Sequence, residues 1–147
     1  MEHEEMREAM ERVYQARASL LSGQVEVRCP SDVMPMLDEY SESEQEHFIA
    51  VLLNGANGVI KAHVVTLGLA NRTIVHPRET FREAVRENAV SIIIAHNHPS
   101  GALLPSLEDS LMTERLIKAG QVLGIPVLDS LIIGRSGYYS FLEKGRM

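Results

Sequence analysis

The sequence predicts an α/β fold in which helices flank a mixed β-sheet. Two short apolar runs, at residues 48–53 and 90–95, are typical of buried strands, and the second of them is rich in β-branched residues. A strong turn sequence at residues 54–58, Asn-Gly-Ala-Asn-Gly, predicts that residues 59–67 form the second strand of a hairpin. Helical patterns separate these runs from later strands, and this mixture predicts a sandwich of helices on a sheet.

The first predicted element is an amphipathic helix at residues 3–21. Its apolar stripe recurs at helical spacing and consists of Met6, Met10, Val13 and Tyr14. The Glu and Arg residues around this stripe are typical of a solvated face, and Ser22-Gly23 ends the pattern. We therefore expect residues 1–24 to form an N-terminal helix and linker, and residues 25–147 to form one domain.

Two further helices are predicted before the second apolar run. Ser31-Asp32 can cap a short helix that continues through Leu37 and is interrupted by Pro35. A helix is also expected after His76-Pro77, leading into the strand at residues 90–95. Its apolar positions are predicted to share one face: Phe81, Ala84, Val85 and Ala89.

The last part of the chain predicts one helix and two strands. A helix begins at Ser106 and continues to about Leu123, where Gly124 and Pro126 end it. Residues 127–133 and 138–142 are expected to be strands joined by a turn at residues 134–137.

Composition is that of an ordinary globular domain. The 147 residues are 45% apolar and 23% charged, which suits a single domain with one sizeable core. No run approaches the roughly 20 apolar residues of a membrane span, and the acidic N-terminus does not resemble a signal peptide. Cys29 is the single cysteine, which excludes an intrachain disulfide and a zinc ribbon. We expect a cytoplasmic protein without a membrane partner.

The charge distribution disfavours direct nucleic-acid binding. The formal net charge is −6, whereas nucleic-acid-binding domains present a basic patch. The arginines that follow the predicted hairpin are interleaved with acidic residues: Arg72, Arg78, Arg82 and Arg86.

The strongest chemical pattern is His96-Asn97-His98 at the end of the second apolar run. Side chains alternate along a strand, so His96 and His98 point the same way and offer two nitrogen ligands. Asp109, folding back from the next element, can supply a third, which leaves an open position as in catalytic zinc sites. Ser106 and Asp109 also match a helix-start signature that requires no metal.

The spacing of His96, His98, Ser106 and Asp109 resembles the metal motif of the JAB1/MPN (JAMM) metalloprotease superfamily. The chain is similar to its bacterial RadC-like branch from about residue 25 to the end, through further matching stretches at residues 75–79, 124–126, 128–129, 132–134 and 139–141. This resemblance implies a cytidine-deaminase-like three-layer sandwich with a mixed β-sheet. It also implies one zinc ion per chain and a peptidase or isopeptidase acting on a peptide or protein substrate.

The resemblance assigns two catalytic roles. Glu46 matches the family's general base, which takes a proton from the attacking water and passes it to the leaving amine. Glu42 and Glu44 are the alternative candidates, and from the residues alone all three are solvated loop acids. The Ser106 hydroxyl is expected to help hold the developing oxyanion.

Two departures from the family concern the surroundings of the predicted site. Residues 102–104, Ala-Leu-Leu, stand where RadC-like sequences usually continue with Asp-Pro, and they either pack or form a hydrophobic lip for a partner. Ser130 follows Asp129 where the family tends to have His, and such a loss can weaken a contact behind the ligands.

A second hypothesis is therefore a non-catalytic binding domain, or a DNA-repair accessory domain, that uses the same fold. Under this hypothesis the partner surface lies at Leu103-Leu104 or on the first helix. That helix packs either on its own domain or on a second subunit, and the second arrangement would form a homo-oligomer.

Overall fold

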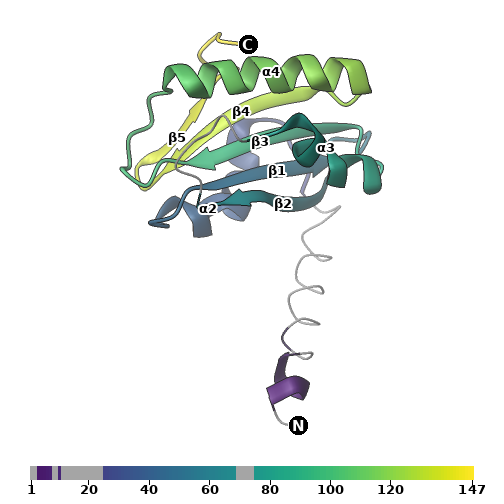
Figure 1. Ribbon diagram of the computed structural model, residues 1–147, viewed down its shortest axis with the longest axis vertical. Helices are drawn as coiled ribbons and strands as arrows, with labels where there is room; N and C mark the ends of the chain where they lie inside the picture. Colours follow the sequence, from purple (N-terminus) through teal and green to yellow (C-terminus); the bar gives the residue numbers. More distant parts are fainter. Residues whose placement is uncertain (1–2, 8–9, 11–24, 69–74) are drawn as a thin grey trace.

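The computed structural model describes residues 3–7, 10, 25–68 and 75–147. A five-stranded mixed sheet lies between helices on both of its faces, which confirms the predicted α/β class (Figure 1). Residues 3–7 and 10 are helical, and the rest of the helix predicted at residues 3–21 lies outside the described residues. The predicted division after residue 24 stays a prediction.

The sheet has the strand order β2-β1-β3-β4-β5. These strands are β1 (His47–Leu53), β2 (Val59–Leu67), β3 (Ser91–Asn97), β4 (Val127–Gly134) and β5 (Gly137–Ser140). Strands β3 and β4 pair in parallel, and the other described pairs are antiparallel. A parallel pair needs a long crossover connection, which here contains helix α4 (Leu107–Leu123).

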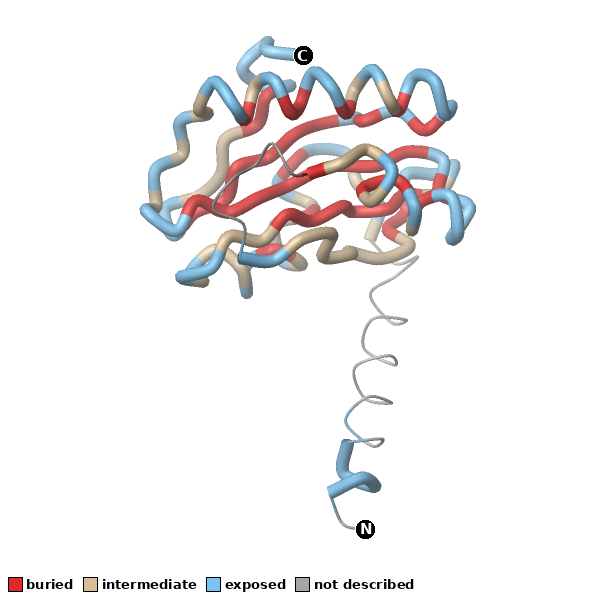
Figure 2. Tube along the Cα trace, viewed as in Figure 1, coloured by how far each residue is buried: buried red, intermediate tan, exposed pale blue. Residues whose placement is uncertain are grey.

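Each face of the sheet has its own apolar core. Helices α3 (Pro77–Arg86) and α4 pack on one face, where the core includes Phe48 and Ile94. Helix α2 (Met34–Ser41) and the short 3-10 helix η1 (Pro30–Asp32) cover the other face. The central strands are therefore buried on both faces, which explains their continuous apolar sequence (Figure 2).

Helix α4 matches the helix predicted from the sequence. Ser106 is its N-cap and accepts a hydrogen bond from the Asp109 backbone N–H, as the capping signature requires. Gly124 ends it with a left-handed backbone at φ 72°, a conformation that glycine adopts without steric cost. Within the described residues, no helix has the length and apolarity that a membrane crossing requires.

Two helix predictions were wrong in detail. Pro35 does not interrupt α2, because it lies in the first turn, where the missing N–H has no intrahelical partner to lose. The helix continues to Ser41, beyond the predicted end. Val85 does not join the apolar face of α3, because its side chain is 56% exposed. The buried residues of this helix are Thr80, Phe81 and Ala84. Ala89 is buried but lies after the end of the helix.

Candidate metal centre

The structure brings three predicted ligands together where strand β3 ends. His96 is on the last part of β3, His98 directly follows the strand, and Asp109 is in the first turn of α4. All three are buried, with Asp109 fully so and His98 the most exposed at 7%. One ligand atom from each residue lies within 4.8 Å of the others, so the cluster can hold a metal ion.

The imidazole nitrogens and the carboxylate face a common point. The Nε2 atoms of His96 and His98 are 3.2 Å apart, which shows that both rings lie on the same side of the strand. The Asp109 carboxylate reaches both rings, with Oδ1 3.0 Å from His96 Nε2 and Oδ2 3.1 Å from His98 Nε2. These short distances are those expected of side chains that share a small cation, rather than of three polar groups with separate roles.

The hydrogen bond on the far side of His98 sets its tautomer. His98 Nδ1 lies 2.7 Å from the carbonyl oxygen of Ala102, and because a carbonyl only accepts, Nδ1 must donate. A neutral His98 then has its Nε2 lone pair facing His96 and Asp109. This is the arrangement found in histidines that bind zinc, whose other nitrogen donates to a carbonyl or carboxylate. The residues therefore fit a metal ion chemically.

Asp109 is held in its charged form. Burial disfavours the carboxylate, but the hydrogen bond from His96 outweighs it and helps to hold the pKa of Asp109 well below its usual range. The Ser106 backbone N–H adds a bond to Oδ2 at 2.8 Å. An ionised carboxylate beside two imidazoles is a donor set that zinc accepts.

The loop after His98 is folded against the end of strand β4. Gly101 has a φ of 82°, which few other residues adopt, and its N–H donates to the His98 carbonyl at 2.8 Å. Leu103 lies over Gly134, because a Cβ placed on that glycine would be only 2.9 Å from Leu103 Cδ2. Leu104 is 77% exposed. Of the two leucines, therefore, one packs and the other faces solvent.

Glu46 continues the line of strand β1 toward this cluster. Its carbonyl accepts a hydrogen bond from Gly68 at 2.7 Å, so the pairing with the β2 side extends past the start of the strand. Phe48 pairs with His96 where the pairing of β1 with β3 ends, and Glu46 lies two residues before Phe48. The backbone at Glu46 therefore lies near the end of β3 that carries His96.

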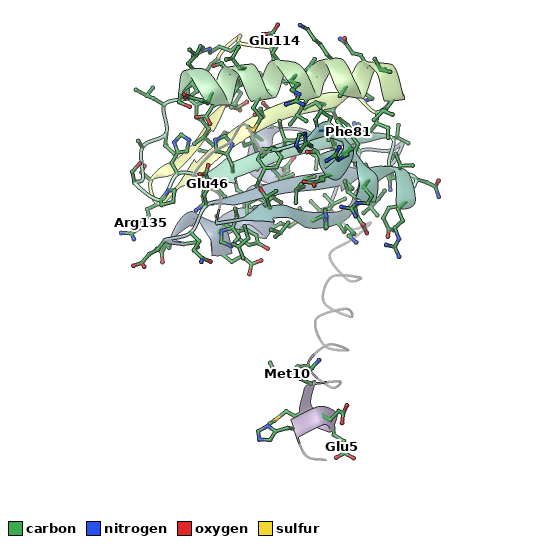
Figure 3. All side chains as sticks on the ribbon, in the orientation of Figure 1. Glu5, Met10, Glu46, Phe81, Glu114 and Arg135 are labelled. Carbon is green, nitrogen blue, oxygen red and sulfur yellow. The ribbon has the colours of Figure 1, made fainter. Side chains whose placement is uncertain are left out.

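Figure 3 shows Glu46 at the end of the sheet where β3 terminates. Glu46 is half-buried there, whereas Glu42 and Glu44, the other two candidates for the general base, are exposed. Ser106 lies at the start of α4, next to Asp109. Its hydroxyl oxygen accepts from the Asp109 N–H, and because a hydroxyl accepts and donates at once, this bond is compatible with the predicted donor role.

Comparison with known proteins agrees with this geometry. The family model of the RadC-like JAB domain matches residues 27–146. The chain belongs to this family. Among its relatives, a "UPF0758 protein" of Desulforamulus reducens is 45% identical over 120 residues, which cover 81% of the chain and 53% of the relative. "UPF0758 protein lmo1549" of Listeria monocytogenes is 47% identical over 132 residues, covering 88% and 59% respectively. The chain spans about half the length of the curated relatives it matches.

Two features of this RadC-like domain had no clear counterpart in the sequence analysis. The Ala102 carbonyl that orients His98 is a backbone group, so no side-chain pattern reveals it. The Ser130 side chain is buried, and its Oγ lies 3.0 Å from Thr113 Oγ1, a contact that was not predicted from the sequence. Thr113 is one helical turn after Asp109 on α4, so its spacing of four residues was the available sequence signal.

Proposed function

We propose that this RadC-like domain is a zinc-dependent hydrolase that cleaves an amide bond in a peptide or protein. The observation that carries the proposal is the convergence of His96, His98 and Asp109, all buried, within 4.8 Å of one another. Two imidazoles and one carboxylate are the ligand set of several catalytic zinc sites, in which the fourth position stays open. Zinc bound there would acidify water and polarise a substrate carbonyl.

Glu46 acts as the general base in this proposal. Its position two residues before Phe48, which pairs with His96, and its half-buried state support the role. Its carboxylate takes a proton from the attacking water and delivers it to the nitrogen of the leaving amine as the amide bond breaks. Proton transfer by a positioned side chain typically contributes about 10²–10⁴-fold to the rate.

Ser106 stabilises charge on the substrate. Its hydroxyl donates to the carbonyl oxygen as that oxygen becomes negative, while the N-cap bond from Asp109 holds the hydroxyl oxygen in place. A single donor of this kind is worth roughly 3–4 kcal/mol of transition-state stabilisation.

The alternative function is a binding platform without catalysis, and one observation favours it. Leu104, Leu107 and Leu111 are 77%, 73% and 56% exposed, although all three are large and apolar. Leu107 and Leu111 are four residues apart on α4 and therefore share a face. A partner, or an apolar part of a peptide substrate, can bind there.

The decisive comparison is between Glu46→Gln and Glu44→Gln. The zinc-loaded proteins would be incubated with a library of unlabelled peptides, and new termini would be identified by mass spectrometry. We expect the parent and Glu44→Gln to cleave the same peptides. Glu46→Gln should be slower by about 100-fold or more, with its zinc retained.

Equal cleavage by the parent and Glu46→Gln would contradict the role of Glu46. If no peptide is cleaved by any of these proteins, while Leu107→Ser with Leu111→Ser abolishes binding of a partner, the platform function replaces the hydrolase.

A further inference from the structure

The side chain of Asn97, between the two histidines, holds the backbone on either side of Glu46. Asn97 is fully buried. Its Oδ1 accepts a hydrogen bond from the His47 N–H at 2.6 Å, and its Nδ2 donates to the Gln45 carbonyl at 2.8 Å. Nδ2 also lies 3.4 Å from the Ser43 carbonyl.

These two bonds have a particular relation to Glu46. The Gln45 carbonyl belongs to the peptide group before the Glu46 Cα, and the His47 N–H belongs to the peptide group after it. One carboxamide therefore binds both peptide groups that set the backbone torsions of Glu46. A side chain held at both neighbouring peptide groups has its direction fixed more firmly than one on an open loop.

The same bonds replace the backbone ladder between two strands. The residue pairing of β1 with β3 begins at Phe48 and His96, so the Asn97 carboxamide supplies the next connection toward Glu46. Alternation along β3 directs His96 and His98 to one face. Residues 96–98 thus provide two candidate metal ligands and, between them, a carboxamide that hydrogen-bonds to the backbone at the start of β1.

We propose that Asn97 is a positioning residue that aims the Glu46 carboxylate at the metal centre. The inference rests on the proposed function, because it assumes that Glu46 serves a metal held by His96, His98 and Asp109. Asn97 contacts neither substrate nor metal in this account. It couples the strand that supplies both histidines to the segment that supplies the base.

The test measures the position of Glu46 directly and needs no substrate. The protein would be loaded with Co²⁺, and the glutamate carboxyl carbons would be labelled with ¹³C, with the Glu46 resonance assigned by its loss in Glu46→Gln. Paramagnetic broadening of this resonance falls steeply with distance from the cobalt ion. The visible spectrum of bound Co²⁺ reports separately whether the ligand set is intact.

The variant is Asn97→Ala, and Asn54→Ala is its matched control. Asn54 also braces backbone with its carboxamide, accepting from Ala56 and Gly58 at 2.9 Å each, but it lies at the opposite end of β1. We expect Asn97→Ala to lose most of the Glu46 broadening and the hydrogen-exchange protection of the His47 amide. Asn54→Ala should keep both, and all three proteins should share one cobalt spectrum.

Other results would overturn the inference in distinguishable ways. Unchanged broadening in Asn97→Ala would remove the positioning role and leave the proposed function standing. Loss of cobalt binding in Asn97→Ala would mean that Asn97 supports the histidines rather than Glu46. Absence of broadening in the parent would show that Glu46 is remote from the metal, and the proposed base would fail together with the inference. If Asn97→Ala does not fold, Asn97→Ser, which replaces the carboxamide by one shorter hydroxyl, is compared in the same way.

Discussion

Ser106 and Asp109 hydrogen-bond to each other in both directions at the start of helix α4. The Asp109 N–H donates to Ser106 Oγ at 3.1 Å, and the Ser106 N–H donates to Asp109 Oδ2 at 2.8 Å. The same Oδ2 lies 3.1 Å from His98 Nε2. The helix-start pattern and the metal-ligand pattern therefore coexist, because the cap turns the carboxylate toward the histidines.

Substitution of Asp109 can separate these two roles. Asp109→Asn keeps an oxygen that can accept from Ser106 but loses the anionic ligand, so we expect zinc affinity to fall by at least about 100-fold. Asp109→Ala also loses the reciprocal bond from the Ser106 N–H, and the metal-free protein should lose about 0.5–2 kcal/mol more of its unfolding free energy than Asp109→Asn. Zinc competition titrations and urea denaturation measure the two quantities. Parent-like zinc affinity in Asp109→Asn would contradict the ligand assignment.

The two leucines of the loop offer a matched pair. Leu103 packs over Gly134 and thereby holds the loop whose Ala102 carbonyl orients His98, whereas Leu104 is exposed. We expect Leu103→Ala to weaken zinc binding by about 10–100-fold, the range typical of groups behind the ligands, and Leu104→Ala to leave it unchanged. Equal zinc affinities for both variants would show that the loop is held in another way.

Gly120 is predicted to be intolerant of a larger residue. A Cβ there would lie 2.5 Å from the Ile125 carbonyl oxygen and 3.3 Å from the Phe81 ring. Gly120→Ala should therefore lower the unfolding free energy by about 1–3 kcal/mol through overpacking, although alanine is the better helix former. Val122→Ala, at a position on the same helix that is 88% exposed, is the control and should change stability by less than about 0.5 kcal/mol. A stabilised Gly120→Ala protein in thermal or urea unfolding would refute this packing.

A pH-dependent effect is expected at Asp32, in η1. Its carboxylate accepts from the backbone N–H groups of Arg28 at 2.8 Å and Cys29 at 3.1 Å, and these bonds lower its pKa below the ordinary 3.8. The folded state thus favours the charged form, so the stabilisation is present above pH 3.8 and is lost as the pH falls through the lowered pKa.

Asp32→Asn should therefore have a lower urea midpoint than the parent near neutral pH, and the difference should shrink toward zero in strong acid. Asp38→Asn, which removes one negative charge from the neighbouring helix α2, controls for the change in net charge. A difference between the parent and Asp32→Asn that does not vary with pH would argue against the bonded carboxylate as its cause.

Local patterns predicted most of the fold. The apolar runs of β1 and β3 and the capped pattern of α4 are properties of neighbouring residues, so their positions agree with the structure within about two residues. Pro35 was ambiguous, because proline both breaks a helix interior and suits a first turn. The exposure of Val85 depends on how α3 lies against the sheet, which a single helix pattern does not contain.

The candidate site was only partly accessible from local sequence. Alternation along a strand predicted that His96 and His98 share a face, and their Nε2 atoms are 3.2 Å apart. Glu46 came from the family resemblance alone. Its place near the end of β3 depends on the register between strands whose contacts, such as His47 with Asn97, join residues 50 positions apart. No short-range pattern encodes that register.

The most direct test of the account is the metal content of the purified protein, without an affinity tag, measured by elemental mass spectrometry. His96→Ala with His98→Ala is the matched variant, and His63→Ala, on strand β2, controls for the loss of a histidine elsewhere. The account predicts about one zinc per chain in the parent and in His63→Ala, and none in the double variant. A parent protein that is free of metal and takes up no added zinc would contradict it.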